Sequence, residues 1–94
     1  MVTFFIPRTN VIESDEGFSV EVLGPTGLRY TEPGRALWLD SEMLAGPAGL
    51  ILYSANMKLE GSAEMVTLDA INRNRIVENV RAAFRFRGFE IQVV

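Results

Sequence analysis

The sequence predicts an α+β domain: an antiparallel β-meander sheet of about five to six strands, packed by one long C-terminal helix and followed by a final C-terminal strand. Short segments of alternating polarity, separated by turns rich in glycine and proline, fill the first part of the chain. Residues 67–88 instead repeat with the helical period. The 94 residues suffice for a single core, so residues 1–94 are expected to form a single α+β domain.

The composition argues against several classes of function. The chain has no cysteine and therefore no disulfide or thiolate site, and it has no histidine, the commonest general base and metal ligand. No apolar run approaches the roughly 20 residues of a membrane-spanning helix, and residues 1–7 lack the basic start of a signal peptide. We therefore expect a cytoplasmic, non-enzymatic protein with no cofactor, no metal and no membrane partner.

The charge is unevenly distributed along the chain. The net charge is −3 overall, made up of −4 over residues 1–47 and +1 over residues 48–94. Such asymmetry is typical of a solvated surface, but it can also steer a basic partner onto the sheet. An acidic total argues against nucleic acid as a partner.

The N-terminal segments predict a hairpin and the strand that follows it. Residues 3–6 are apolar and stop at Pro7, which suits either an edge strand or an arm lying on the core. Residues 11–13 predict the next strand, and residues 14–17 predict a turn that ends in glycine. The strand at 18–23 is half-buried, and its apolar face carries Phe18, Val20 and Val22.

Two turns, at residues 24–27 and 32–35, each contain proline and glycine and flank a strand at 28–32. The next strand spans 36–43, and its two faces differ in character. One face is assigned to the core and carries Leu37, Leu39 and Met43. The opposite face carries Trp38, Asp40 and Glu42.

Residues 44–49 contain two glycines and a proline and predict a loop. Residues 50–54 are almost wholly apolar, which is typical of a central strand covered on both faces, so we place this strand in the middle of the sheet. Residues 55–66 are expected to be a connector with an apolar patch at Met57 and Leu59.

The C-terminal helix has recognisable ends. Thr67 or Asp69 can cap its start, and Gly88 suits its C-terminal end. Its apolar arc comprises Ile76, Val77, Val80, Ala83 and Phe84, and its polar side comprises Asn74, Arg75, Glu78, Arg81 and Arg85. In the final strand, Phe89, Ile91 and Val93 alternate with other residues, so one face is expected to enter the core.

Asp40 and Glu42 form a carboxylate pair on one strand face. Such a pair suits acid–base catalysis or a divalent cation, but no further clustered oxygen ligand is visible, so a solvated strand face is favoured. Trp38 beside these acids is typical of a protein-binding surface, and burial of Trp38 in the core is the alternative. No catalytic residue and no metal ligand is assigned.

The helix offers an alternative, basic face. It comprises Arg75, Arg81, Arg85 and Arg87, and it would suit a nucleic-acid or small-ligand binding module whose affinity falls with added salt. A solvated helix face with intrahelical ion pairs explains the same arginines. The basic and aromatic residues at 84–89 lie at a helix end, where arginines complement the helix dipole.

Two stretches, residues 38–53 and 75–93, resemble a family of small bacterial proteins classed as immunity protein 74, most distinctively at 42–47 and 85–90. The resemblance covers roughly residues 28–94. The family has an aromatic residue near the position of Leu59, so the chain departs from it there. The resemblance implies an immunity partner in a polymorphic toxin system, that is, a protein that binds and neutralises a cognate toxin.

Together, the strand face and the resemblance predict a contact patch for a cognate protein toxin. The patch comprises Trp38, Asp40 and Glu42 with Ala45, Gly46 and Pro47 of the adjoining loop. The charges would speed the encounter, and the tryptophan would anchor the complex. Nothing in the pattern specifies an oligomeric state.

Overall fold

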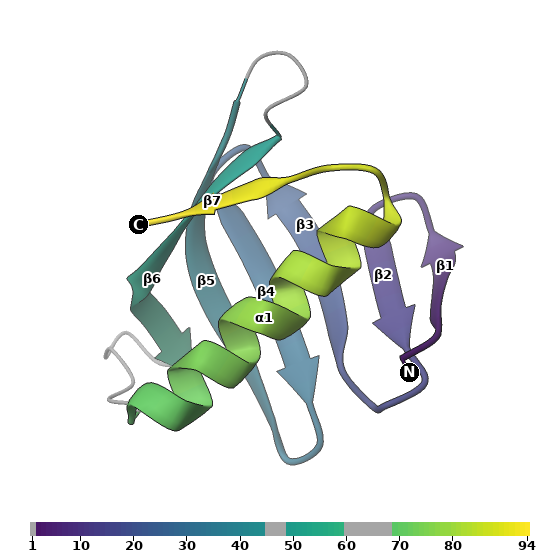
Figure 1. Ribbon diagram of the computed structural model, residues 1–94, viewed down its shortest axis with the longest axis horizontal. Helices are drawn as coiled ribbons and strands as arrows, with labels where there is room; N and C mark the ends of the chain where they lie inside the picture. The colour runs from purple at the N-terminus through teal and green to yellow at the C-terminus, as the bar shows by residue number, and fades with distance from the viewer. Residues whose placement is uncertain (1, 45–48, 60–68) are drawn as a thin grey trace.

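The computed structural model describes residues 2–44, 49–59 and 69–94. Strands within these residues form one sheet in sequence order, with the bounds β1 (Phe4–Arg8), β2 (Val11–Ser14), β3 (Ser19–Gly24), β4 (Gly27–Glu32), β5 (Arg35–Met43), β6 (Leu50–Leu59) and β7 (Ile91–Val93). Helix α1 (Ala70–Phe86) links β6 to β7 and crosses the concave face of the curled sheet (Figure 1). The predicted α+β fold is confirmed: β1 to β6 form the antiparallel meander, and β7 is the predicted final strand after the helix.

The core lies between α1 and the inner face of the sheet. The residues of α1 that are buried are the predicted apolar arc, namely Ile76, Val77, Val80, Ala83 and Phe84. They pack against inner side chains of the central strands, which include Val20, Leu28, Tyr30, Leu37, Leu39 and Leu52. The helical period at residues 67–88 therefore predicted which side of the helix would be covered.

Local hydrogen bonds define both ends of α1. The Asp69 side chain accepts a hydrogen bond from the Asn72 backbone N–H at 2.8 Å, so Asp69 is the N-cap. At the other end, the N–H groups of Gly88 and Phe89 bond to the carbonyls of Arg85 and Phe84, and Gly88 has φ +88°. This is a Schellman motif, which requires the left-handed conformation that glycine adopts readily. Within the described ranges, no helix is long and apolar enough to cross a membrane.

Strand β1 is an edge strand, which settles the two alternatives for the N-terminal apolar run. Its pairing with β2 is irregular between Phe5 and Arg8, the interval that contains Pro7. Proline has no N–H to donate, so an irregular edge tolerates it. The Phe4 ring contacts the ring of Phe18 in the core and that of Phe86 at the end of α1, with centroids 5.9 and 5.5 Å apart.

Strand β6 differs from its prediction in three respects. It runs to Leu59 rather than Ser54, so the first part of the predicted connector is strand; residues 60–66 lie outside the described residues. It is not the middle of the sheet, because β7 alone lies beyond it, paired in parallel. Only one face is fully buried, since Leu50 and Leu52 are inaccessible whereas Ile51 and Tyr53 are half-exposed.

The pairing of β5 with β6 is interrupted by a large irregularity. Leu39 pairs with Met57, but Ser41 pairs with Leu52, so an interval of two residues in β5 faces an interval of five residues in β6. Extra residues of this kind bend a strand and redirect its side chains. Met57 is consequently buried in the core, whereas Leu59, which was predicted to share its apolar patch, is exposed.

Two apolar residues predicted to enter the core are largely exposed. Met43 is 51% exposed, although it follows Leu37 and Leu39 on the inner side of β5. Phe89 is 40% exposed and precedes β7, whereas Ile91 is buried and Val93 packs against the core. Both exposed residues lie beside the end of α1, where the helix no longer covers the sheet. Alternation predicted their side of the sheet but not the extent of the helix.

We predict that two isoleucines of α1 have very different effects on stability. Ile76→Ala should lower the free energy of unfolding by about 2–5 kcal/mol, because it leaves a cavity in the core. Ile71→Ala is the matched control, and because Ile71 is 80% exposed the change should stay within about 0.5 kcal/mol. Urea denaturation followed by circular dichroism measures both, and equal losses would contradict the packing described above.

We also predict opposite outcomes for two buried serines. The Ser14 hydroxyl donates to the Phe18 carbonyl and accepts from the N–H groups of Glu16 and Phe18, so Ser14→Ala should destabilise by about 1–3 kcal/mol. The buried Ser41 hydroxyl has no hydrogen-bond partner among the described residues, so Ser41→Ala should be neutral or stabilising by up to about 1 kcal/mol. Thermal unfolding measures both, and a marked loss for Ser41→Ala would contradict the assignment.

Candidate functional site

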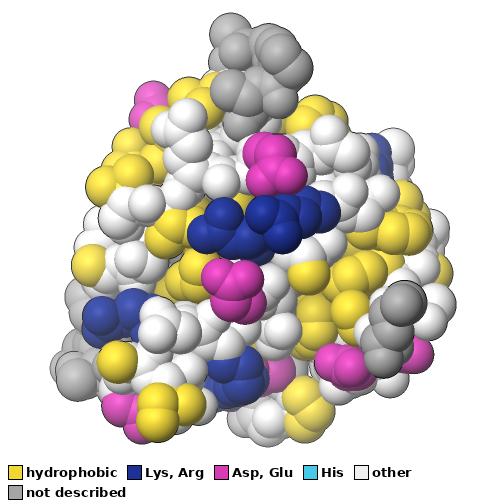
Figure 2. Space-filling view, in the orientation of Figure 1, with side chains coloured by type: hydrophobic (Ala, Val, Ile, Leu, Met, Phe, Trp, Pro, Cys, Tyr) yellow, Lys and Arg dark blue, Asp and Glu magenta, His cyan; other side chains and the backbone are white. Residues whose placement is uncertain are grey.

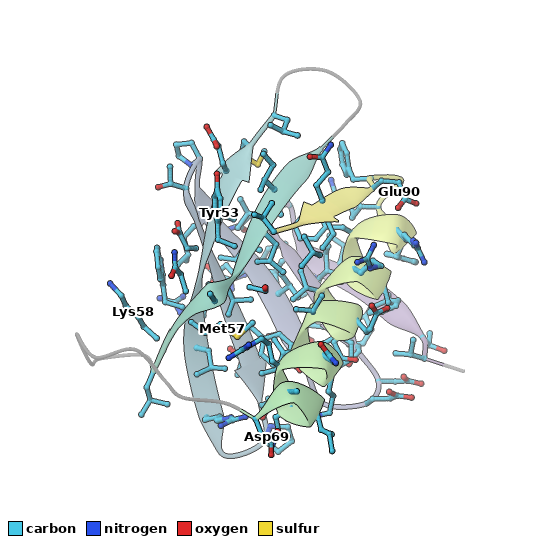
Figure 3. The ribbon with its side chains drawn as sticks, turned by 60° about the vertical axis from the view of Figure 1, so that its left-hand side comes forward. Tyr53, Met57, Lys58, Asp69 and Glu90 are labelled. Carbon is cyan, nitrogen blue, oxygen red and sulfur yellow. The ribbon has the colours of Figure 1, made fainter. Side chains whose placement is uncertain are left out.

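The predicted strand face and its neighbours on β6 form a surface that we call the outer patch, made up of Trp38, Asp40, Glu42, Tyr53, Asn56 and Lys58. It lies on the side of the sheet away from α1. Figure 3 illustrates the two sides at β6, where Met57 points toward α1 and Lys58 points away from it. Trp38 pairs with Lys58 across the two strands. The structure therefore brings together the three predicted residues of β5.

Trp38 is a half-exposed residue of the sheet surface and not part of the core. Its indole lies over Gly27 on the adjacent strand, where a Cβ atom would approach Trp38 Nε1 to 2.7 Å. The Lys58 ammonium lies 5.2 Å from the ring centroid, in cation–π geometry. Glycine on one side and lysine on the other thus hold the ring in a defined position.

Neutral donors from β6 hold the two carboxylates of the outer patch. Asp40 accepts a hydrogen bond from the Asn56 side-chain amide at 3.1 Å, and Glu42 accepts one from the Tyr53 hydroxyl at 2.9 Å. The bond to Glu42 raises the pKa of Tyr53, because it stabilises the protonated phenol. The salt bridges found in the described part of the chain involve neither acid. Both carboxylates are therefore positioned without being neutralised.

The contribution of β6 to this surface is not among the residues predicted from the sequence. Asn56 and Lys58 alternate with Met57 and Leu59, a period-two pattern that indicates a strand, so the expectation of a connector at these residues is wrong. The irregular pairing with β5 places Asn56 beside Asp40, and no sequence rule anticipates that register. The predicted loop residues Ala45, Gly46 and Pro47 lie outside the described residues.

Each arginine of the predicted basic face of α1 has a partner. Arg75 binds Glu32 at 2.7 Å, Arg81 pairs with Glu78 at 3.5 Å, Arg85 pairs with Glu90 at 3.2 Å, and Arg87 donates to the Thr9 carbonyl at 3.0 Å. Figure 2 shows this face, with basic side chains near its centre and acidic side chains on either side of them. The face is therefore one of alternating charge, and three of its four guanidinium groups are paired with carboxylates.

A polar cluster joins α1 to the inner face of the sheet. Arg75 forms a two-pronged contact with the Glu32 carboxylate, which Arg35 also binds at 2.9 Å. One turn further along α1, the Asn79 amide donates to the Tyr30 hydroxyl at 2.9 Å. Glu32, Arg75, Asn79 and Tyr30 line a cleft of about 290 Å³. The sequence pattern places Arg75 on the polar side of the helix but carries no signal for its partner, because Glu32 lies 43 positions away.

The environment of this cluster shifts two pKa values in opposite directions. Hydrogen bonding to Arg75 holds the pKa of Glu32 below its usual value, although partial burial opposes the effect. Burial raises the pKa of Tyr30 to about 12, and the Glu32 carboxylate adds to the shift while the Asn79 amide opposes it. The cluster therefore combines an ionised carboxylate with a neutral phenol, as expected of a fixed structural contact.

The acidic residues do not assemble into a metal site in the part of the chain that the structure describes. No group of three or more acidic side chains there lies close enough to hold a metal ion. Asp40 and Glu42 instead hydrogen-bond to an amide and a phenol, respectively.

Comparisons of the chain with protein-family models, with curated proteins and with solved structures find no match. The resemblance to immunity protein 74 therefore stays a prediction from the sequence.

We predict that titration of Tyr30 destabilises the fold at high pH. Its pKa is raised from about 10 in the unfolded chain to about 12 in the folded state. The contribution of the neutral phenol to the free energy of unfolding is therefore complete below pH 10 and declines as the pH rises toward 12. Tyr30→Phe should flatten this part of the stability profile, measured by thermal unfolding at a series of pH values. A decline that is identical in wild type and Tyr30→Phe would contradict the assignment.

Proposed function

We propose that this chain is a non-enzymatic protein-binding domain whose outer patch contacts a basic surface of a protein partner. The observation that carries the proposal is the arrangement of Trp38, Asp40 and Glu42. One aromatic ring is fixed against Gly27, and the two nearby carboxylates accept hydrogen bonds from neutral donors rather than from a basic side chain.

The arrangement suits an interface because little order has to be gained on binding. A positioned tryptophan supplies a large contact area, and tryptophan is among the residues that most often dominate binding energy. Carboxylates that are already oriented lose little side-chain entropy when a partner's lysine or arginine reaches them. Their negative charge also accelerates the encounter with a basic surface, in a way that salt weakens.

The kind of partner that we propose is a cognate toxin, and this finer proposal rests on the resemblance to immunity protein 74. A toxin with a basic active-site surface would be blocked when the outer patch covers it. The acidic N-terminal half, with a net charge of −4, supports the same polarity of partner. On this proposal the protein acts in the cytoplasm by steric occlusion, with no chemical step of its own.

Nucleic-acid binding by the arginine face of α1 is not proposed as a second function. Arg75, Arg81 and Arg85 are paired with carboxylates, so phosphate binding would first have to displace these partners. Acidic residues among the arginines also repel a polyanion.

We predict that reversing the charge of the outer patch abolishes capture of the partner. Immobilised wild-type protein should retain one specific protein from the lysate of its source, identified by mass spectrometry, and the Asp40→Lys/Glu42→Lys variant should not. Trp38→Ala should weaken the purified complex about tenfold or more, as expected for a central aromatic. Calorimetry with the purified partner measures this loss.

The matched control is Glu78→Lys/Glu90→Lys, which changes the net charge equally but lies on and beside α1. The exposed ion pairs that Glu78 and Glu90 form in the wild type contribute little to stability, so this variant should stay folded and retain the partner. Equal loss of binding in both double variants would show that the loss comes from the change in net charge and not from the outer patch. Retention of the partner by a folded Asp40→Lys/Glu42→Lys variant would refute the proposed footprint.

A further inference from the structure

An apolar cavity opens at the C-terminal end of α1, separate from the outer patch. It has a volume of about 270 Å³ and lies between the helix end, the turn from β1 to β2, and strands β3 and β5. Its apolar walls are Ile12, Val22, Met43, Phe84 and Phe89. A smaller cavity of about 80 Å³ shares the last three of these residues and extends to Leu50. The two cavities are therefore neighbours, and the larger one is called the recess below.

The end of the helix creates this recess. The Schellman motif at Gly88 turns the chain away from the axis of α1, so Phe89 stands beside Phe84 instead of continuing the helix. Met43 lies opposite them at the end of β5, and both Met43 and Phe89 remain substantially exposed. Large apolar side chains gathered around an open recess are typical of a binding site.

The rim of the recess carries a positive charge in a fixed position. Arg87 lines the cavity, and its Nη1 donates to the Thr9 carbonyl at 3.0 Å, which orients the guanidinium. Arginine has five N–H donors, so others stay available to a ligand. Among the described residues that line the two cavities, Arg87 alone is charged.

The turn after the helix weakens the negative pole that would oppose this charge. That pole arises from carbonyls in the last turn that lack partners. Here the N–H groups of Arg87 and Phe89 bond to the Phe84 carbonyl, and that of Gly88 bonds to the Arg85 carbonyl. Two of the carbonyls are therefore occupied, and the Arg87 guanidinium is the charged group that an anion would meet at the rim.

We propose that this recess binds a small amphipathic carboxylate, with an aliphatic chain in the apolar cavity and the carboxylate on Arg87. Carboxylates match the planar donors of a guanidinium in geometry and charge. The volume lies near the lower end of the range for ligand pockets, so the chain is short, as in a medium-chain fatty acid. This site is independent of the protein contact proposed for the outer patch.

The test uses the whole wild-type chain and two series of probes below their micelle concentrations. In the first series, butanoate, hexanoate and octanoate differ in chain length, and affinity should rise about fourfold per methylene group until the recess is full. In the second, octanoate, octanol and octylamine share a chain but differ in charge, and octanoate should bind most tightly and octylamine least. Calorimetry and backbone NMR shifts measure affinity and location. Absence of saturable octanoate binding, or equal binding of all three head groups, would overturn the proposal.

Variants separate the role of Arg87 from general electrostatics. Arg87→Gln should weaken octanoate binding about tenfold or more, because a charge-assisted hydrogen bond is lost, and it should leave octanol binding unchanged, which also reports that the recess is intact. Arg85→Gln is the matched control, since Arg85 carries the same charge nearby but does not line the recess. Equal weakening by the two variants would overturn the assignment of the carboxylate to Arg87.

A further variant tests the position of the ligand without removing the hydrogen bond from Arg87 to the Thr9 carbonyl. Met43→Glu places a negative charge at the mouth of the recess on a side chain that is already exposed, so the fold should tolerate it. It should weaken octanoate binding and strengthen octylamine binding. Unchanged affinities for both probes would contradict the proposed position of the ligand.

Discussion

The burial of one apolar stripe of α1 against the inner face of the sheet is the constraint on which the rest of the structure depends. The sheet is a single layer, and its central inner residues, such as Leu28 and Leu37, are inaccessible because α1 covers them. Where the helix ends, cover ends too, and Met43 and Phe89 are exposed. The outer face has no such cover within the described chain. The outer face and the surface beside the helix end therefore stay accessible, and these are the surfaces that the two proposals use.

Polar contacts along α1 set the position of its apolar stripe on the sheet. Arg75 binds Glu32 near the start of the helix, Asn79 binds the buried Tyr30 hydroxyl, and Arg87 reaches the turn from β1 to β2 at the other end. Exposed ion pairs each contribute little to stability, whereas a buried phenol without its partner would be costly. We interpret these contacts as setting the direction and rotation of the helix, and the apolar stripe as supplying most of the stability.

The irregular pairing of β5 and β6 connects the fold to the outer patch. The first part of β6, Leu50 to Leu52, pairs with β5 on one side and with β7 on the other, and after the extra residues the last part pairs with β5 alone. The same irregularity brings Asn56 beside Asp40 and leaves the buried Ser41 hydroxyl without a partner among the described residues.

The sequence by itself determined the α+β class, the buried stripe of α1, the end of the helix at Gly88, and the side of β5 that carries Trp38, Asp40 and Glu42, whereas it left the N-cap open between Thr67 and Asp69. These features depend on local periodicity and on conformational preferences within a few residues of the chain. Only the tertiary structure decided the bend in β6, the packing of the Trp38 indole against Gly27 and the pairing of Arg75 with Glu32. It also decided where the cover of α1 ends. Each of these depends on register or contact between segments distant in sequence, which hydrophobic periodicity does not encode.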